Sequence, residues 1–83
     1  MSERTQTIRR IVQEHGRIPN SIDGVADDAS LYNVGLTSHA TVNVMLALED
    51  EFDIEFPERF LNRSTFETIA SLRAAIGSIM GEG

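Results

Sequence analysis

The sequence predicts an all-α fold, a small antiparallel four-helix bundle with three main helices and one short helix. Three segments carry apolar residues three and four positions apart, which is the period of an amphipathic helix. Glycine and proline residues stand between these segments and are expected to end helices there. Strands are not expected, because the one alternating stretch, Asp53–Phe56, is too short and too acidic.

The first helix is expected over residues 3–15, where the apolar stripe ends on a partly buried His15. Gly16 should then end the helix in the left-handed conformation. The connection over residues 17–37 combines turn-forming and apolar residues, so it is expected to be ordered against the bundle, with a short helical turn near Ser30–Asn33.

The second helix is the clearest element and is expected over residues 38–53, with no glycine or proline inside it. Val44 and Thr41 are expected to flank its core face. That face is predicted to consist of Val42, Met45, Leu46, Leu48, Glu49 and Phe52.

Pro57 favours a short third helix over residues 58–62, with Phe60 and Leu61 pointing inward. The fourth helix is expected over residues 69–80. Two N-caps compete for its start, the pair Ser64 and Glu67, and Thr68 alone. We prefer Thr68, which leaves Phe66 free to enter the core.

Composition limits the function. The chain of 83 residues predicts one domain over residues 1–83, with a thin core and no deep enclosed active site. It has no cysteine and two histidines, so no metal site is expected. The net charge of −6 argues against nucleic acid and fits docking to basic protein surfaces.

A membrane partner is not expected either. The longest apolar run, Val44–Leu48, is too short to cross a bilayer. The first residues lack the apolar core of a secretion signal, so we expect a cytoplasmic location.

Thr37 and Ser38 stand directly before the second helix, where one hydroxyl is needed as an N-cap. If Thr37 is the cap, Ser38 occupies the first helical position with its hydroxyl outward. An anion attached there is favoured by the helix dipole and the free N–H groups. Capping alone remains an alternative explanation of the pair.

Two motifs carry a more specific indication. A Gly-Leu-Thr-Ser turn at residues 35–38 precedes a helix that ends Leu-Glu-Asp-Glu-Phe-Asp-Ile-Glu-Phe-Pro at residues 48–57. Phe-Glu-Thr-Ile follows at residues 66–69. In these motifs the chain resembles the acyl carrier protein family over roughly residues 30–76.

The resemblance implies a non-catalytic carrier with that family's four-helix fold, modified at Ser38 with 4'-phosphopantetheine from coenzyme A by a phosphopantetheinyl transferase. The thiol of this arm would hold an acyl or aminoacyl group as a thioester. Other implied partners are an activating ligase and a downstream acceptor enzyme. Some carriers of this type are loaded by ligases related to class II aminoacyl-tRNA synthetases, notably seryl-tRNA synthetases. Such a carrier is expected to be a monomer.

The chain departs from the family pattern beside Ser38. Thr37 stands where aspartate is usual, His39 where leucine is common and Ala40 where an acid is common. These changes favour a discrete carrier for a special pathway, with acyl and aminoacyl cargo equally supported. The second helix and the acidic segment after it are expected to dock partners, through Thr37, His39, Val42, Asn43 and Glu49.

Three other functions were weighed. An unmodified acidic adaptor that binds a basic partner is the main alternative. A calcium-binding module is less favoured, because the acidic residues over 49–58 do not have the spacing or the glycine of an EF-hand loop. Hydrolysis by the neighbours Ser38 and His39 is disfavoured, since adjacent helical side chains point in different directions.

Overall fold

The computed structural model describes residues 3–19 and 21–81. Within these ranges the secondary structure is entirely helical, which confirms the predicted fold class. The elements are α1 (Glu3–His15), the 3-10 helix η1 (Ile22–Gly24), α2 (Ser38–Phe52), the 3-10 helix η2 (Glu58–Phe60), α3 (Arg63–Phe66) and α4 (Ile69–Ile79). No helix in the described ranges is long and apolar enough to cross a membrane.

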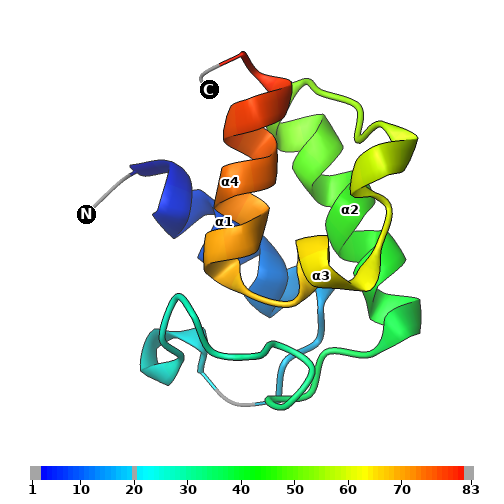
Figure 1. Ribbon diagram of the computed structural model, residues 1–83. Coiled ribbons are helices and arrows are strands. Elements are labelled where there is room, and N and C mark those ends of the chain that lie inside the picture. The colour runs from blue at the N-terminus through cyan, green and yellow to red at the C-terminus, as the bar shows by residue number, and fades with distance from the viewer. Residues whose placement is uncertain (1–2, 20, 82–83) are drawn as a thin grey trace.

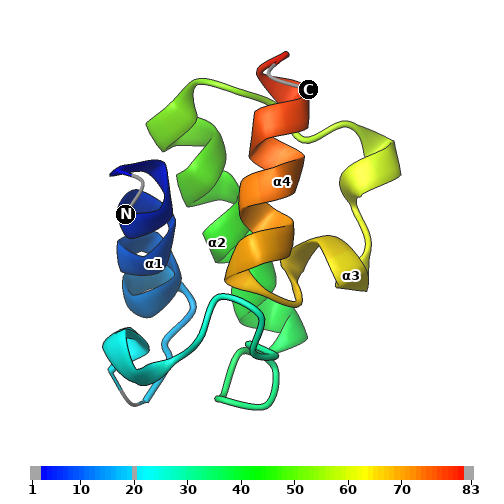
Figure 2. The same ribbon diagram turned by 60° about the vertical axis from the view of Figure 1, so that its left-hand side comes forward.

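The three long helices surround one core. Helix α1 packs against both α2 and α4, and it runs in the opposite direction to them (Figures 1 and 2). The short helix α3 precedes α4 and packs against it. The long connection between α1 and α2 crosses one end of the bundle, the same end at which α2 begins (Figure 1).

The core is built from apolar residues of every long helix and of the connection. Its buried members are Ile8, Ile11, Val12, Ile18, Ile22, Leu31, Leu36, Ala40, Val44, Leu48, Phe56, Phe66, Ile69, Leu72, Ala75 and Ile76. Helix α1 has the bounds predicted for it, and Thr5, which the apolar pattern did not include, is also buried. The prediction for His15 was wrong, because its side chain is exposed at the end of the stripe.

The end of α1 differs from the expectation for Gly16. The residue with the left-handed conformation is Arg17, at φ 55°. Gly16 is instead needed for space, since a Cβ atom there would lie 2.5 Å from the carbonyl oxygen of Val12 and 3.1 Å from Leu36 Cδ1. A buried glycine at this position therefore lets the connection turn back tightly over the core.

The core face of α2 agrees with the prediction in part, since Leu48 is buried as expected and Met45 and Phe52 pack against the core. Its buried residues are Ala40, Val44 and Leu48, which are four positions apart. Val42 and Leu46 are instead 52% and 54% exposed. Residues four positions apart lie on one side of a helix, so Ala40, Val44 and Leu48 face the core together, and Val42 and Leu46 lie outside this stripe.

Helix α2 ends at Asp53, which adopts the left-handed conformation at φ 54° and donates its N–H to the carbonyl of Glu49. The side chain of Glu49 reaches further and accepts the N–H of Phe56 at 2.8 Å. This bond brings Phe56 into the core, where its ring centroid lies 5.5 Å from that of Phe66.

The helix predicted over residues 58–62 begins at Glu58 as expected but is shorter, since the 3-10 helix η2 ends at Phe60. Phe60 packs against the core, whereas Leu61 is 50% exposed rather than pointing inward. The short helix α3 begins later, because the Asn62 side chain accepts the N–H of Thr65 at 3.0 Å and caps it.

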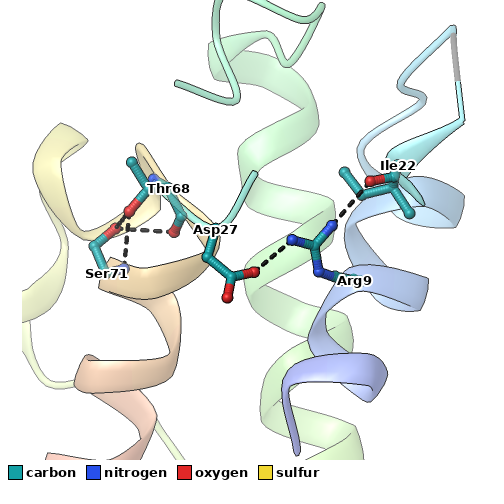
Figure 3. A network of polar contacts seen from close by, with 5 residues as sticks. All are labelled: Arg9, Ile22, Asp27, Thr68 and Ser71. Carbon is teal, nitrogen blue, oxygen red and sulfur yellow. Dashed lines mark hydrogen bonds and ion pairs between the residues drawn. The ribbon is translucent and has the colours of Figure 1, made fainter. Parts of the chain in front are cut away.

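The start of α4 is capped as we preferred. Thr68 Oγ1 accepts the N–H of Ser71 at 2.9 Å, and Ser71 Oγ accepts the N–H of Thr68 at 3.1 Å (Figure 3). The competing box is absent, since the Ser64 hydroxyl donates to Asn62 instead. Phe66 is buried, as expected from this choice of cap.

The described part of the long connection packs against the bundle, and the short helical turn predicted near Ser30–Asn33 is of the 3-10 type. Bonds between residues three apart make tight turns there, such as Asn33 N–H to the carbonyl of Ser30 at 3.2 Å. Arg9 holds the connection from α1 by donating to Asp27 and to the carbonyl of Ile22 (Figure 3).

Two backbone hydrogen bonds fix the other side of this connection. The N–H of Leu31 donates to the carbonyl of Glu67 at 2.7 Å, and the N–H of Ala70 donates to the carbonyl of Asp27 at 2.9 Å. The segment that leads to Ser38 is thus attached to the junction between α3 and α4.

Candidate functional site

Ser38 is the first residue of α2, and its side chain is exposed. The residue before it performs the capping. Thr37 Oγ1 accepts the N–H of Ala40 at 3.0 Å, and the carbonyl of Thr37 accepts the hydroxyl of Thr41 at 2.8 Å. The Ser38 hydroxyl has no hydrogen-bond partner among the described residues. The helix therefore does not need this hydroxyl, and water or a partner can reach it.

The electrostatic setting at Ser38 suits an anion. The first turn of α2 contains no acidic residue. Peptide dipoles and unpaired N–H groups give the start of a helix a partial positive charge. A phosphate ester at Ser38 would lie in this favourable field, with no nearby carboxylate on the same turn to repel it.

Ser38 borders an open groove between α2 and α3 with a volume of about 540 Å³. Its walls are mainly apolar. The lining residues are Tyr32, Ser38, Thr41, Val42, Met45, Leu61, Asn62, Arg63 and Phe66. The groove explains why Val42 and Leu61 remain half exposed, since each forms part of its wall rather than part of the core.

The five residues expected to dock a partner do not form one cluster. Thr37 and His39 are exposed beside Ser38, and Val42 lines the groove. Asn43 borders a separate hollow that contains His15 and Leu46. Glu49 is 11 positions beyond Ser38, or roughly 16 Å along the helix axis, and its carboxylate is bound to Phe56 N–H.

Sequence reasoning assigned two of the nine groove residues, Ser38 and Val42, to the site. Among those it missed are Tyr32, Leu61, Asn62 and Arg63, which lie outside α2. They come from the long connection and from the segment around the start of α3. No local pattern places them beside Ser38, because only the packing of those segments against α2 does so. The one available signal was Asn62 as a helix cap, which would have moved α3 to its observed position.

The structure offers no arrangement for hydrolysis or metal binding around Ser38. His39 is exposed, and its ring does not bond to the Ser38 hydroxyl. In residues 3–19 and 21–81, no group of three or more histidine, cysteine, aspartate or glutamate side chains could hold a metal ion. The chemistry that fits the site is attachment of a group to an exposed oxygen.

Comparison with known protein families gives a match over most of the chain. The model for the family described as "Phosphopantetheine attachment site" matches residues 6–76. An aminoacyl carrier protein from Agrobacterium fabrum is 43% identical over 74 residues, which are 89% of this chain and 89% of that protein.

Two solved structures with the same fold contain a carrier protein bound to an enzyme. In one, an engineered Bradyrhizobium japonicum glycine:[carrier protein] ligase is complexed with ATP and a carrier protein from Agrobacterium tumefaciens. The match has a TM-score of 0.87 and 43% identity over 90% of this chain and 97% of that one. In the other, the ligase from the same organism is complexed with a glycylated carrier protein. That match has a TM-score of 0.72 and 29% identity over 89% and 99% of the chains.

Proposed function

The chain belongs to the phosphopantetheine attachment-site family of carrier proteins, and we propose that it is an aminoacyl carrier modified with 4'-phosphopantetheine at Ser38. The observation that carries the proposal is the position of the Ser38 hydroxyl, exposed and unbonded at the start of α2. Thr37 supplies the cap, so modification of Ser38 removes no hydrogen bond from the fold.

The attachment chemistry requires only one oxygen from this chain. Ser38 Oγ attacks the phosphorus of coenzyme A that bears the pantetheine, and the new P–O bond displaces adenosine 3',5'-bisphosphate. The hydroxyl proton passes to a base of the phosphopantetheinyl transferase. Backbone N–H groups at the first turn of α2 then lie beside the negative charge of the new phosphodiester and stabilise it.

The attached group supplies a thiol, which this cysteine-free chain lacks. We infer that the cargo is an amino acid held as a thioester. Support comes from the aminoacyl carrier relative at 43% identity and from the glycylated carrier in a structure of the same fold. Acyl and aminoacyl cargo were equal on sequence alone, and these relatives favour the aminoacyl form.

The proposed partners follow from this cargo. They are a phosphopantetheinyl transferase, an amino acid:[carrier protein] ligase and an enzyme that accepts the aminoacyl group. The ligase is proposed because a carrier that is 43% identical to this chain was solved bound to a glycine:[carrier protein] ligase. The chain itself would contribute no catalytic group and would act as a cosubstrate.

The test is intact-mass measurement after incubation with coenzyme A and a phosphopantetheinyl transferase of broad specificity. We expect the wild type to gain one phosphopantetheine group and Ser38→Ala to gain none. Ser78→Ala is the matched control, since Ser78 is an exposed serine in α4 and its variant should gain the group normally. Incubation of the modified protein with glycine, ATP and a glycine:[carrier protein] ligase should then add one glycyl group, which hydroxylamine should remove.

The outcomes separate the alternatives. A gain that persists in Ser38→Ala would exclude Ser38 as the attachment residue. Absence of any gain in the wild type would favour an unmodified acidic adaptor. Modification without glycyl loading, together with loading of a fatty acid by an acyl-activating ligase, would contradict aminoacyl cargo.

A further inference from the structure

Arg63 lies in the same groove as Ser38 and is held there by an aromatic ring. Its guanidinium carbon is 4.0 Å from the ring centroid of Tyr32, within the range of a cation–π contact. Both residues line the groove that Ser38 borders. Arg63 thus places a fixed positive charge in an otherwise mainly apolar groove.

Among the described residues, the guanidinium has no polar partner apart from its contact with the Tyr32 ring. In the part of the chain that the structure describes, the Arg63 side chain forms no ion pair with a carboxylate and no hydrogen bond. None of the residues that line the groove is acidic. The cation–π contact with Tyr32 uses no N–H donor in a hydrogen bond, and a guanidinium binds oxyanions well through paired donors.

We propose that Arg63 is a positioning residue that binds the phosphodiester oxygens of the group attached at Ser38. The inference rests on the proposed modification of Ser38 and adds a second contact to it. The start of α2 would stabilise the phosphodiester from one side and the Arg63 guanidinium from the groove. The first part of the arm would then lie along the groove instead of pointing away from the protein.

Arg59 provides an internal comparison. Its guanidinium also lies over a ring, 4.9 Å from the centroid of Phe60, but it does not line the groove that contains Ser38. A cation–π contact therefore occurs at two arginines near α3, and only Arg63 of the two lines the groove that Ser38 borders. If the cation–π contacts have only a structural role, Arg63→Gln and Arg59→Gln should have the same effect on the phosphodiester.

The experiment compares four modified proteins, the wild type, Arg63→Gln, Arg63→Lys and the control Arg59→Gln. Phosphorus-31 NMR measures the chemical shift and line width of the phosphodiester. Proton–nitrogen spectra of the arginine Nε–H groups are recorded before and after modification. In the wild type we expect the Arg63 Nε–H resonance to shift on modification and the Arg59 resonance to stay in place.

For the phosphodiester we expect the wild type and Arg59→Gln to give the same phosphorus signal, broader than that of Arg63→Gln and at a different chemical shift. Arg63→Gln should lose the shift and narrow the line, and Arg63→Lys should keep part of both effects because it retains the charge. An unchanged phosphorus signal in Arg63→Gln, or an Arg63 resonance that modification does not move, would overturn the inference. The wild-type Arg63 resonance keeps this test decisive even if a variant does not fold. Failure of the wild type to accept the group at all would instead overturn the attachment itself.

Discussion

The carboxylate of Glu49 accepts the backbone N–H of Phe56 at 2.8 Å, so a side chain in the last turn of α2 holds the segment that follows it. The bond spans the left-handed turn at Asp53 and sets Phe56 against Phe66. Docking by Glu49 stays a prediction, and the structure adds a contact of its carboxylate within the fold.

Removal of this carboxylate should therefore destabilise the protein. We expect Glu49→Ala to lower the free energy of unfolding by about 1–2 kcal/mol, because a partly buried N–H loses a charged acceptor. Glu49→Gln keeps an oxygen acceptor and should lower the free energy of unfolding by a smaller amount. Urea unfolding followed by circular dichroism measures both, with the exposed neighbour Asp50→Ala as a control expected within ~0.5 kcal/mol of wild type. Equal losses for the Glu49→Ala and Asp50→Ala proteins would contradict the role of the bond.

The orientation of α2 can be tested with two leucines two positions apart. Leu48 is fully buried and Leu46 is 54% exposed. We expect Leu48→Ala to lower the free energy of unfolding by about 2–5 kcal/mol, and Leu46→Ala to change it by less than ~0.5 kcal/mol. Thermal or urea unfolding measures the difference. Comparable losses at the two positions would mean that α2 presents another face to α1.

Gly16 should not tolerate a side chain. A Cβ atom there would meet the Val12 carbonyl and the side chains of Leu36 and Val44, the nearest contact being 2.5 Å. We expect Gly16→Ala to destabilise the protein by about 1–3 kcal/mol through overpacking.

Gly24→Ala is the matched control for this substitution, because no atom lies within 4 Å of a Cβ built at Gly24. Its loss of chain entropy in the unfolded state should leave stability unchanged or raise it by up to ~1 kcal/mol. Calorimetry of both variants provides the measurement. A destabilised Gly24→Ala protein beside an unaffected Gly16→Ala protein would refute the packing argument.

Thr37 and Ser38 should separate into a structural and a functional residue. We expect Thr37→Ala to lower the free energy of unfolding by about 0.5–2 kcal/mol, because the N–H of Ala40 loses its cap, and Thr37→Ser to restore most of it. Ser38→Ala should stay within ~0.5 kcal/mol of wild type. Chemical unfolding of the unmodified proteins checks this, and a large loss in Ser38→Ala would identify Ser38 as the cap instead.

Local rules predicted those parts of the fold that neighbouring residues decide. The bounds of α1 follow from the spacing of Ile8, Ile11 and Val12, and Thr68 competes successfully for the cap of α4. The assignment of the cap to Thr37, which leaves Ser38 outward, also needed only the chemistry of a helix start.

Other features depend on packing between distant segments. Helix α2 carries apolar residues on several sides, so hydrophobicity alone does not choose its core face, and packing against the rest of the bundle buries the stripe with Ala40. The segment after Pro57 is predicted as one helix, whereas the Asn62 cap divides it and starts α3. The groove could not be predicted at all, since Tyr32 and Arg63 meet only after the connection and α3 are in place.

The two backbone bonds from the long connection to the junction between α3 and α4 also determine how far a carried group can travel. Leu31 and Asp27 are bonded there, and the N–H of Leu36 donates to the carbonyl of Leu31 at 3.0 Å, so the chain before Ser38 is tied to the bundle. If Ser38 carries the proposed arm, that arm starts from a point attached to the core. A free carrier can bind two enzymes in turn, and in each complex the proposed arm would have to reach the active site from Ser38.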